Sequence, residues 1–202
     1  MSSEPEAGNE LTRVFSAASM RAVAHPARLA SIRYLSSVGP ATATELGELV
    51  GLTPSAMSYH LRAMERAGLI ETAPTRGDGR ERLWQSKHTG GWEITSFEDG
   101  TTETRQASAE LMDTILTMQE VDVRQWMSHS AEPGWLDAGF FANTLILATQ
   151  DELHALGEKI AAMLRAYHPR HRVGSAPADA IAMRAVFRGF PANGLPEGYM
   201  KQ

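Results

Sequence analysis

Residues 42–68 read TATELGELVGLTPSAMSYHLRAMERAG and carry two helix starts joined by a glycine-bearing turn. Thr42 and Glu45 are spaced as a capping box, which indicates the start of a helix. Gly51 suits the residue just past the end of that helix, because glycine adopts a positive φ without strain. These signals predict a short helix over residues 42–50.

A second helix is predicted directly after this turn. Thr53 is a suitable N-cap, and Pro54 is favoured at the first helical position because the N–H that it lacks has no partner there anyway. The helix is expected to run to about Ala67 and to end at Gly68. Its inward face consists of Met57, Leu61 and Met64. Two helices joined by so short a turn predict a helix-turn-helix.

The segments on both sides extend the pattern. Upstream, apolar periodicity predicts two helices, Leu11–Ala24 and Pro26–Ser37. Downstream, two strand-like segments, residues 69–73 and 81–86, flank residues 74–80, whose glycines favour a tight hairpin. This order of elements is typical of a winged helix-turn-helix domain.

The rest of the chain predicts helices with a few strands. Residues 92–97 alternate weakly, as a strand would, and a long helix with a broad apolar surface is expected over residues 102–127. Gly139–Thr149 and Ile181–Phe190 read as strands before and after a helix over residues 150–167. The predicted fold class is mainly α, α+β: a winged helix-turn-helix domain followed by a long helix and a small β-α-β extension.

The second helix of the stretch carries side chains suited to nucleic acid. A helix that lies in a DNA major groove needs small or polar residues on its outward face to approach the base edges. Its N-terminus also directs free N–H groups and a positive dipole end at phosphate. The residues predicted to contact DNA from this helix, from its cap and from the cap of the preceding helix are Thr42, Thr53, Ser55, Ala56, Ser58, Tyr59, His60 and Arg62.

The hairpin adds basic side chains to this surface. Arg76, Arg80 and Arg82 surround its glycine-bearing turn, and arginines there can enter a minor groove or clamp phosphates. Asp78 at the tip is expected to serve the turn. For His60 two roles stay open, contact with phosphate or packing between the helix and the hairpin. A winged helix can also bind a protein instead of DNA, in which case it should tolerate loss of the arginines.

Three segments together resemble ArsR-type bacterial transcriptional regulators. Val23–Leu29 (VAHPARL) resembles that family's opening helix motif, Leu52–Leu61 its recognition helix and Gly79–Trp84 its wing. The resemblance spans residues 20–90 and implies a homodimeric repressor or activator on an inverted-repeat operator. It implies a DNA-reading role for Ser55, Ser58, Tyr59 and His60, and a structural role for His25 and Pro26.

Composition excludes several classes of protein. The 202 residues include no Cys, so disulfides, thiolate metal sites and cysteine nucleophiles are excluded. No apolar run reaches the length of about 18 residues that a membrane span needs, and the acidic start MSSEPEAGNE is unlike a secretory signal. Residues 1–88 carry ten Lys and Arg against nine Asp and Glu, whereas residues 89–202 carry nine against fifteen. The acidic C-terminal half is therefore expected to face away from DNA.

Other candidate sites are weaker. His168 and His171 have a spacing that metal sites use, but Pro169 lies between them and their basic neighbours repel a cation, so no metal is expected. Aromatic and Met side chains of the C-terminal half fit either a small-molecule pocket or a core and dimer interface. The motifs of phosphate-binding loops, dinucleotide sites, serine hydrolases and zinc proteases are absent, so neither a cofactor nor an enzyme is expected.

The sequence thus predicts a cytoplasmic, homodimeric transcriptional regulator of the repressor kind. Residues 1–10 are expected to be disordered, residues 11–90 to form the DNA-binding domain, and residues 91–202 to form an extension that dimerises and is a candidate ligand sensor. Its expected partners are double-stranded DNA, a second copy and an unidentified small-molecule effector, with no membrane. The alternatives are a winged-helix module that binds a protein, and a small-molecule sensor in which DNA binding is secondary.

Overall fold

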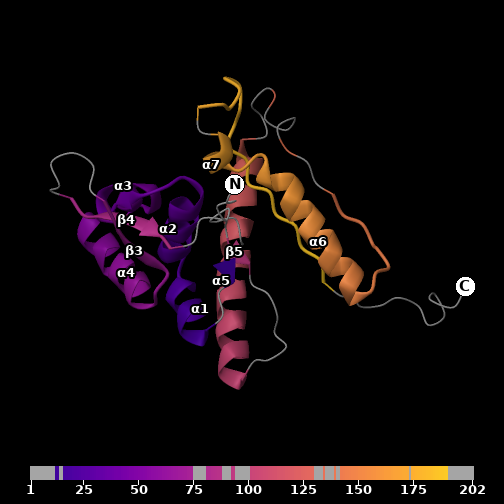
Figure 1. Cartoon of the computed structure of the whole chain (residues 1–202), viewed down its shortest axis with the longest axis horizontal. Coiled ribbons are helices and arrows are strands. Elements are labelled where there is room, and N and C mark those ends of the chain that lie inside the picture. Colours follow the sequence, from indigo (N-terminus) through magenta and orange to yellow (C-terminus); the bar gives the residue numbers. More distant parts are fainter. Residues whose placement is uncertain are drawn as a thin grey trace, which may run out of the picture. The chain divides into compact units, whose positions relative to one another are not determined.

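The computed structural model describes residues 12–13, 16–74, 81–87, 92–93, 101–129, 134, 139, 142–172 and 174–190. The chain divides into two compact units, Met1–Trp135 and Leu136–Gln202, which are described one at a time. The first unit contains α1 to α5 and β1 to β5, and the second contains α6 and α7 (Figure 1). Among the described residues, no helix is long and apolar enough to cross a membrane. The predicted disorder of residues 1–10 lies outside the described residues.

The first unit has the element order of a winged helix-turn-helix. Its elements are β1 (Thr12–Arg13), α1 (Ala17–Val23), α2 (Pro26–Ser37), β2 (Ala41–Thr42), α3 (Ala43–Val50), α4 (Pro54–Arg66), β3 (Ile70–Ala73), β4 (Leu83–Ser86), β5 (Trp92–Glu93) and α5 (Thr102–Ser128). α3 and α4 are the helix-turn-helix pair, and β3 and β4 flank the residues of the predicted hairpin. The predicted helices over residues 26–37, 42–50, 54–67 and 102–127 are confirmed to within one residue.

Side-chain caps fix where these helices begin and end. The Thr42 hydroxyl accepts a hydrogen bond from the Glu45 N–H at 3.2 Å, and the Glu45 carboxylate accepts one from the Thr42 N–H at 2.6 Å, which confirms the capping box. Thr53 caps α4 by accepting a hydrogen bond from the Ala56 N–H at 3.3 Å. Gly51 ends α3 with a φ of +70°, the left-handed conformation predicted for it.

The N-terminal helix is shorter than predicted. Instead of starting near Leu11, α1 starts after Ser16, because the Ser16 hydroxyl accepts a hydrogen bond from the Ser19 N–H at 3.0 Å and caps the helix there. The short strand β1 precedes it and pairs in parallel with β5. Of the strand predicted over residues 92–97, β5 is present, and residues 94–97 lie outside the described residues.

A three-stranded antiparallel sheet supports the hairpin. Its order is β2-β4-β3, so β4 is the central strand. Trp84 of β4 lies opposite Ala41 of β2 and Thr72 of β3, and its side chain is buried. Because this large indole is buried, its packing stabilises the position of β4, at the base of the hairpin, against the core.

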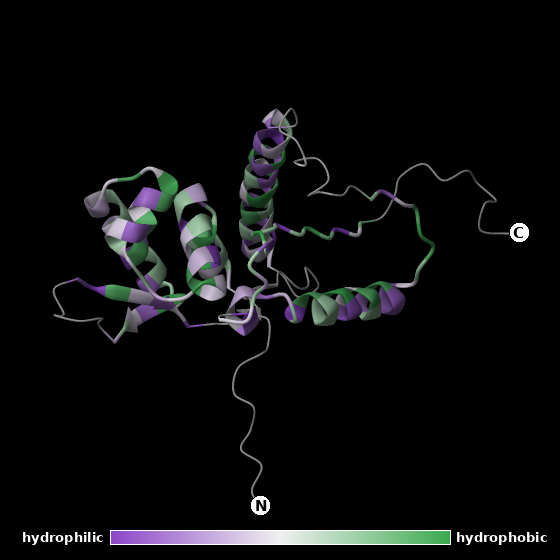
Figure 2. Cartoon of the chain, turned by 90° about the horizontal axis from the view of Figure 1, so that it is seen from above, coloured by the Kyte–Doolittle hydropathy of each residue, from purple (hydrophilic) through white to green (hydrophobic). Residues whose placement is uncertain are grey.

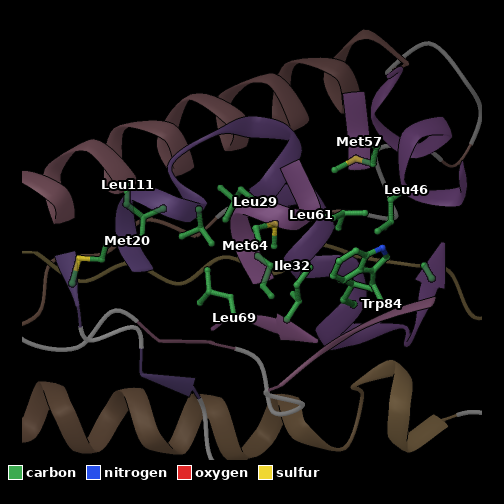
Figure 3. Close-up of a cluster of buried hydrophobic side chains, with 14 of the residues drawn as sticks. Met20, Leu29, Ile32, Leu46, Met57, Leu61, Met64, Leu69, Trp84 and Leu111 are labelled. Atoms are coloured by element: carbon green, nitrogen blue, oxygen red, sulfur yellow. The ribbon is translucent and has the colours of Figure 1, made fainter. Parts of the chain in front are cut away.

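The core lies where α2, α4 and the sheet meet (Figure 3). Leu29 and Leu35 of α2 and Leu61 and Met64 of α4 are completely buried. Each of these apolar side chains contributes roughly 1.5–3 kcal/mol through removal from water. The same burial fixes the orientation of α4 in the domain.

The long helix α5 has two different halves. In the first half Ala107, Leu111 and Ile115 are buried against the domain, and α5 packs along α1. The Arg21 guanidinium of α1 pairs with the Glu103 carboxylate at 2.6 Å. In the second half the apolar side chains of Leu116, Val121, Val123 and Met127 are exposed.

The second unit is built around α6 (Gln150–Arg165), with the short helix α7 (Pro169–Arg172) after it. None of the α6 residues is buried. The strands predicted over residues 139–149 and 181–190 are absent from the described residues of the chain, and that prediction is wrong for a single copy. Residues 142–149 and 181–190 instead form elongated segments without secondary structure (Figure 1). A strand needs a neighbouring strand for its backbone hydrogen bonds, and among the described residues neither segment is paired in a sheet.

Candidate nucleic-acid interface

α4 has a buried face and an open face. Met57, Leu61 and Met64 have no exposed surface, so they hold the helix against the domain as predicted. On the opposite face Ser55, Tyr59 and Arg62 are exposed, and Ala56 and Ser58 are partly exposed. The Tyr59 side chain retains 63% of its accessible surface. An exposed aromatic ring on a firmly held helix is available to a partner.

A polar hollow of about 240 Å³ opens beside this face. It is lined by Thr42, Ala43, Thr44, Pro54, Ser58, Arg62, Glu81, Arg82 and Trp84. These residues come from the first turns of α3 and α4, from the middle of α4 and from the base of the hairpin. The structure therefore brings Thr42, Ser58, Arg62 and Arg82, all predicted site residues, around one hollow.

Arg82 is held in place by three neighbours. Its Nε donates a hydrogen bond to the Thr72 hydroxyl at 3.0 Å, and its Nη2 lies 3.4 Å from the Glu65 carboxylate. Its guanidinium also lies over the Trp84 ring, 4.5 Å from the ring centre. A guanidinium on an indole face is favourable by about 0.5–1 kcal/mol at an exposed site. Arg82 is thus pre-positioned at the edge of the hollow.

The tip of the hairpin lies outside the described residues. This applies to Arg76 and Arg80, which were predicted to contact DNA, and to Asp78, which was predicted to serve the turn. Glu81, at the start of the described part, lies 3.5 Å from the Thr44 hydroxyl of α3. That contact ties the base of the hairpin to the helix-turn-helix.

His60 lies against α2 and not against the hairpin. Its Nδ1 accepts a hydrogen bond from the Arg28 Nε at 3.3 Å, and its ring centre lies 4.5 Å from that of His25. Of the two roles left open for His60, packing between α4 and the hairpin is not what the described residues show, because its partners come from α2 and the residue before it. Its ring also meets Tyr59 edge-on, with ring centres 5.6 Å apart. His60 thus connects the recognition face to the start of α2.

His25 caps α2, in keeping with its expected structural role. Its Nδ1 accepts a hydrogen bond from the Ala27 N–H at 3.2 Å, and Pro26 occupies the first helical position. Both imidazoles therefore use an unprotonated Nδ1, because a backbone N–H and an arginine Nε can only donate. Arg28 also donates from Nη1 to the Ala22 carbonyl at 3.3 Å.

The surroundings of both histidines favour the neutral form. Burial lowers the pKa of His25 below its ordinary 6.5, and the nearby Arg28 charge lowers it further. Burial also lowers the pKa of His60, with additional lowering from His25 and then from Arg28. Neutral imidazoles are the form that the two Nδ1 hydrogen bonds require.

Gly47 sets the approach of α3 to α4. A Cβ at this position would lie 2.6 Å from the Leu52 carbonyl oxygen, which is backbone and cannot swing aside. The Leu52 N–H also donates to the Gly47 carbonyl at 2.8 Å, so the turn is closed directly over this residue. The absence of a side chain here lets the two helices meet.

Sequence reasoning missed three features of this surface. The close approach at Gly47 could have been predicted, because an isolated glycine inside a helix usually allows close packing against a neighbour. The contacts of Arg28 with His60 and of Arg82 with Glu65 join residues far apart in the chain, and no local pattern signals them.

Comparison with known proteins assigns this part of the chain. Residues 23–73 match the family model of a helix-turn-helix domain. This part of the chain is therefore a helix-turn-helix domain, in keeping with the predicted likeness to ArsR-type regulators. The predicted resemblance is therefore confirmed. Helix-turn-helix domains of this kind bind DNA through the second helix of the pair, which is α4 here.

Three solved structures resemble the chain. One, described as a "possible transcriptional regulator for arsenical resistance", is 23% identical and covers 56% of this chain and 97% of its own, with a TM-score of 0.31. RV1404 from Mycobacterium tuberculosis is 18% identical over 81% and 86% of the two chains, with a TM-score of 0.30. A mutant of ZitR from Lactococcus lactis is 14% identical over 81% and 87%, with a TM-score of 0.27. No curated protein matches the chain.

The described residues offer no metal centre. Within them, no group of three or more His, Cys, Asp or Glu side chains is arranged to hold a metal ion. His168 and His171 do approach each other, with ring centres 6.0 Å apart. Two imidazoles without a third ligand make a poor site for zinc.

Proposed function

We propose that this chain is a sequence-specific transcriptional repressor that binds an inverted-repeat operator as a homodimer. The observation that carries the proposal is the division of α4 into two faces. Its buried face fixes the helix to the domain, while Ser55, Tyr59 and Arg62 stand exposed along the other. That arrangement suits a helix which enters a major groove and reads base edges.

Each open residue of α4 has a defined chemical task in this proposal. Arg62 has a planar fork of donors that matches the two acceptors of a guanine edge. Ser55 and Ser58 are small enough to let the helix backbone approach the bases, and their hydroxyls donate or accept. Tyr59 supplies an apolar ring that can contact a thymine methyl group. Thr42 and Thr53, at the first turns of α3 and α4, lie where backbone N–H groups meet phosphate.

The hairpin supplies the charge for sequence-independent affinity. Arg82 lies at the edge of the hollow beside α4, held by Thr72, Glu65 and Trp84. Arg76 and Arg80 are assigned the same task, contact with the phosphates that flank the major groove. Each phosphate neutralised releases counterions, so binding weakens as salt rises.

The second half of α5 supports the homodimer. Leu116, Val123 and Met127 are spaced so that they share one side of the helix, and all three are exposed. The side chains that pack on the domain, Leu111 and Ile115 among them, lie on a different side. An apolar stripe that no other described residue of the first unit covers fits a second copy of α5. Two recognition helices in such a dimer would enter successive major grooves about 34 Å apart, which requires a two-fold symmetric operator.

Regulation is expected to act on the dimer as a whole, in the cytoplasm. Repression would follow from occupation of a promoter by the bound dimer. A small-molecule effector can change this only by binding the DNA-competent and incompetent dimers unequally.

Selection of duplexes from a random library tests the proposal. Wild-type protein should enrich an inverted repeat whose half-sites lie about one helical turn apart. Arg62→Ala should relax the preference at one base pair of each half-site, at a cost of about 1–3 kcal/mol. Glu110→Ala, on the exposed side of α5, is the matched control and should enrich the same sequence as wild type. Failure to enrich any sequence, while a protein partner is bound in the same preparation, would favour the winged-helix interaction module.

A further inference from the structure

The second unit has many exposed apolar side chains. The exposed large apolar side chains are Leu145, Ile146, Leu147, Leu153, Leu156, Met163, Leu164, Tyr167, Ile181, Met183, Val186, Phe187 and Phe190. At roughly 100 Å² for each of these half-exposed side chains, the total is on the order of 1,000 Å². The largest apolar patch of a typical monomer is about 300–600 Å², whereas a stable dimer removes about 800 Å² from each partner.

The two elongated segments are arranged around α6 like the strands of a β-α-β unit. Residues 142–149 lead directly into the start of α6. At the end of residues 181–190, a Cβ added to Gly189 would lie 3.0 Å from Leu153, which is also at the start of α6. Both segments therefore finish at the same end of α6, as the two strands of a β-α-β unit do. In Figure 2 long parts of both segments are coloured hydrophobic, and α6 alternates between hydrophobic and hydrophilic bands.

The side-chain pattern of residues 142–149 is typical of a central strand. Leu145, Ile146 and Leu147 are successive apolar residues, and successive side chains of a strand point to opposite faces. A strand that is apolar on both faces belongs in a sheet interior. Residues 181–190 differ, because Arg184 and Arg188 share one face of the segment. Charged residues of that kind are typical of edge strands.

We propose that residues 142–149 pair antiparallel with the same residues of a second copy, forming the centre of an intermolecular sheet. A second copy fits because two-fold symmetry brings identical strands together in antiparallel register and satisfies both backbones at once. A small molecule could cover apolar side chains but would not supply a ladder of backbone hydrogen bonds. This inference rests on the proposed homodimer and adds to α5 a second contact within it. Residues 181–190 then form the outer strands of the sheet.

Cysteine cross-linking tests this pairing, and the chain has no Cys of its own. Cysteine is introduced singly at each of residues 142–149 in the full-length protein. Opposed residues of an antiparallel pair have Cα atoms about 4.5–5.5 Å apart, and a disulfide spans about 4.4–6.8 Å. Mild oxidation should therefore give a covalent dimer with one maximum of yield along the segment, falling off on both sides. Glu158→Cys, on the polar side of α6, is the control and should remain uncross-linked.

Val123→Cys in α5 separates this inference from the proposed dimer. Cross-linking at Val123 without any along residues 142–149 would overturn the sheet and leave the α5 dimer standing. Cross-linking at neither site would overturn both. Hydrogen exchange of the unmodified protein gives a second readout that does not depend on variants. Amides of residues 142–149 should be protected in the dimer and exchange faster on dilution to monomer. Fast exchange in a dimer that stays intact would overturn the pairing and point to a different occupant of this surface.

Discussion

Replacement of Gly47 by alanine should destabilise the helix-turn-helix. The added Cβ would lie 2.6 Å from the Leu52 carbonyl oxygen and 3.6 Å from its carbon. Because the obstacle is backbone, relief requires the turn after α3 to move away. The hydrogen bond from the Leu52 N–H to the Gly47 carbonyl, 2.8 Å long, would be stretched by the same movement.

Whether Gly47→Ala raises or lowers the free energy of unfolding depends on the sizes of opposing effects. Alanine in a helix interior is favoured over glycine by about 1 kcal/mol. Overpacking costs about 1–3 kcal/mol, and a weakened backbone hydrogen bond costs about 0.5–1.5 kcal/mol. The net effect of Gly47→Ala should be a loss of about 1–3 kcal/mol in the free energy of unfolding. DNA affinity should fall as well, because α4 is displaced relative to α3. A loss of about 1.4 kcal/mol in binding free energy corresponds to a tenfold weaker affinity, and we expect at least that.

Two other glycines serve as matched controls. Gly157 lies inside α6 with nothing within 4 Å of its added Cβ, so Gly157→Ala should raise stability by up to about 1 kcal/mol. Gly51 also has open space, but its φ of +70° makes alanine unfavourable by about 1–2 kcal/mol. Neither variant requires α4 to move, so their DNA affinity should stay within about threefold of wild type.

Urea unfolding followed by circular dichroism measures the stability of these variants. Fluorescence anisotropy with the selected operator duplex measures affinity under conditions where each variant is folded. If Gly47→Ala matched Gly157→Ala in both stability and affinity, the close approach at Leu52 would have no energetic consequence and the reasoning would be refuted.

Three further predictions concern other parts of the first unit. Because the pKa values of His25 and His60 are lowered in the folded state, the stability linked to them is present above about pH 6.5 and is lost as pH falls below it. Urea unfolding from about pH 7.5 to pH 5 should show this loss, and His60→Gln should reduce it, whereas an unchanged slope would exclude the pair as its source. His25→Ala should cost about 1 kcal/mol of cap energy in thermal unfolding and His25→Asn only a few tenths, so equal losses would contradict the capping role. Leu111→Ala should cost about 2–5 kcal/mol because the side chain is fully buried between α5 and the domain; a loss below about 1 kcal/mol by the same assay would show that α5 does not belong to the core.

The helix-turn-helix was predictable because its signals are local. A capping box, a glycine at the helix end and a proline at the first helical position each act within a few residues, and each was found where predicted. The start of α1 was misplaced because the apolar pattern of residues 11–24 outweighed the cap signal of Ser16. Periodicity shows that a helix exists more reliably than it shows where the helix begins.

The candidate site was predictable only in part. The open face of α4 follows from helical spacing around Met57 and Leu61, which the structure buries. The position of His60 does not follow from spacing, because its partners His25 and Arg28 come from another helix. For residues 142–149 the sequence shows a strand pattern, but a strand forms only where a neighbour satisfies its backbone. Periodicity alone does not name that neighbour.

The central claim, that α4 reads a DNA sequence, is tested most directly by the affinity of the full-length protein for its selected duplex and for a scrambled duplex of equal composition. Anisotropy is measured for both from about 50 to 200 mM salt, where phosphate contacts weaken steeply. The account predicts a preference of about 1,000-fold or more for the selected duplex at every salt concentration. Replacement of Arg62 by alanine should lower this preference, while the slope of log affinity against log salt concentration should stay within about one unit of wild type. Equal affinity for the two duplexes, or no binding to either at about 50 mM salt, would contradict it.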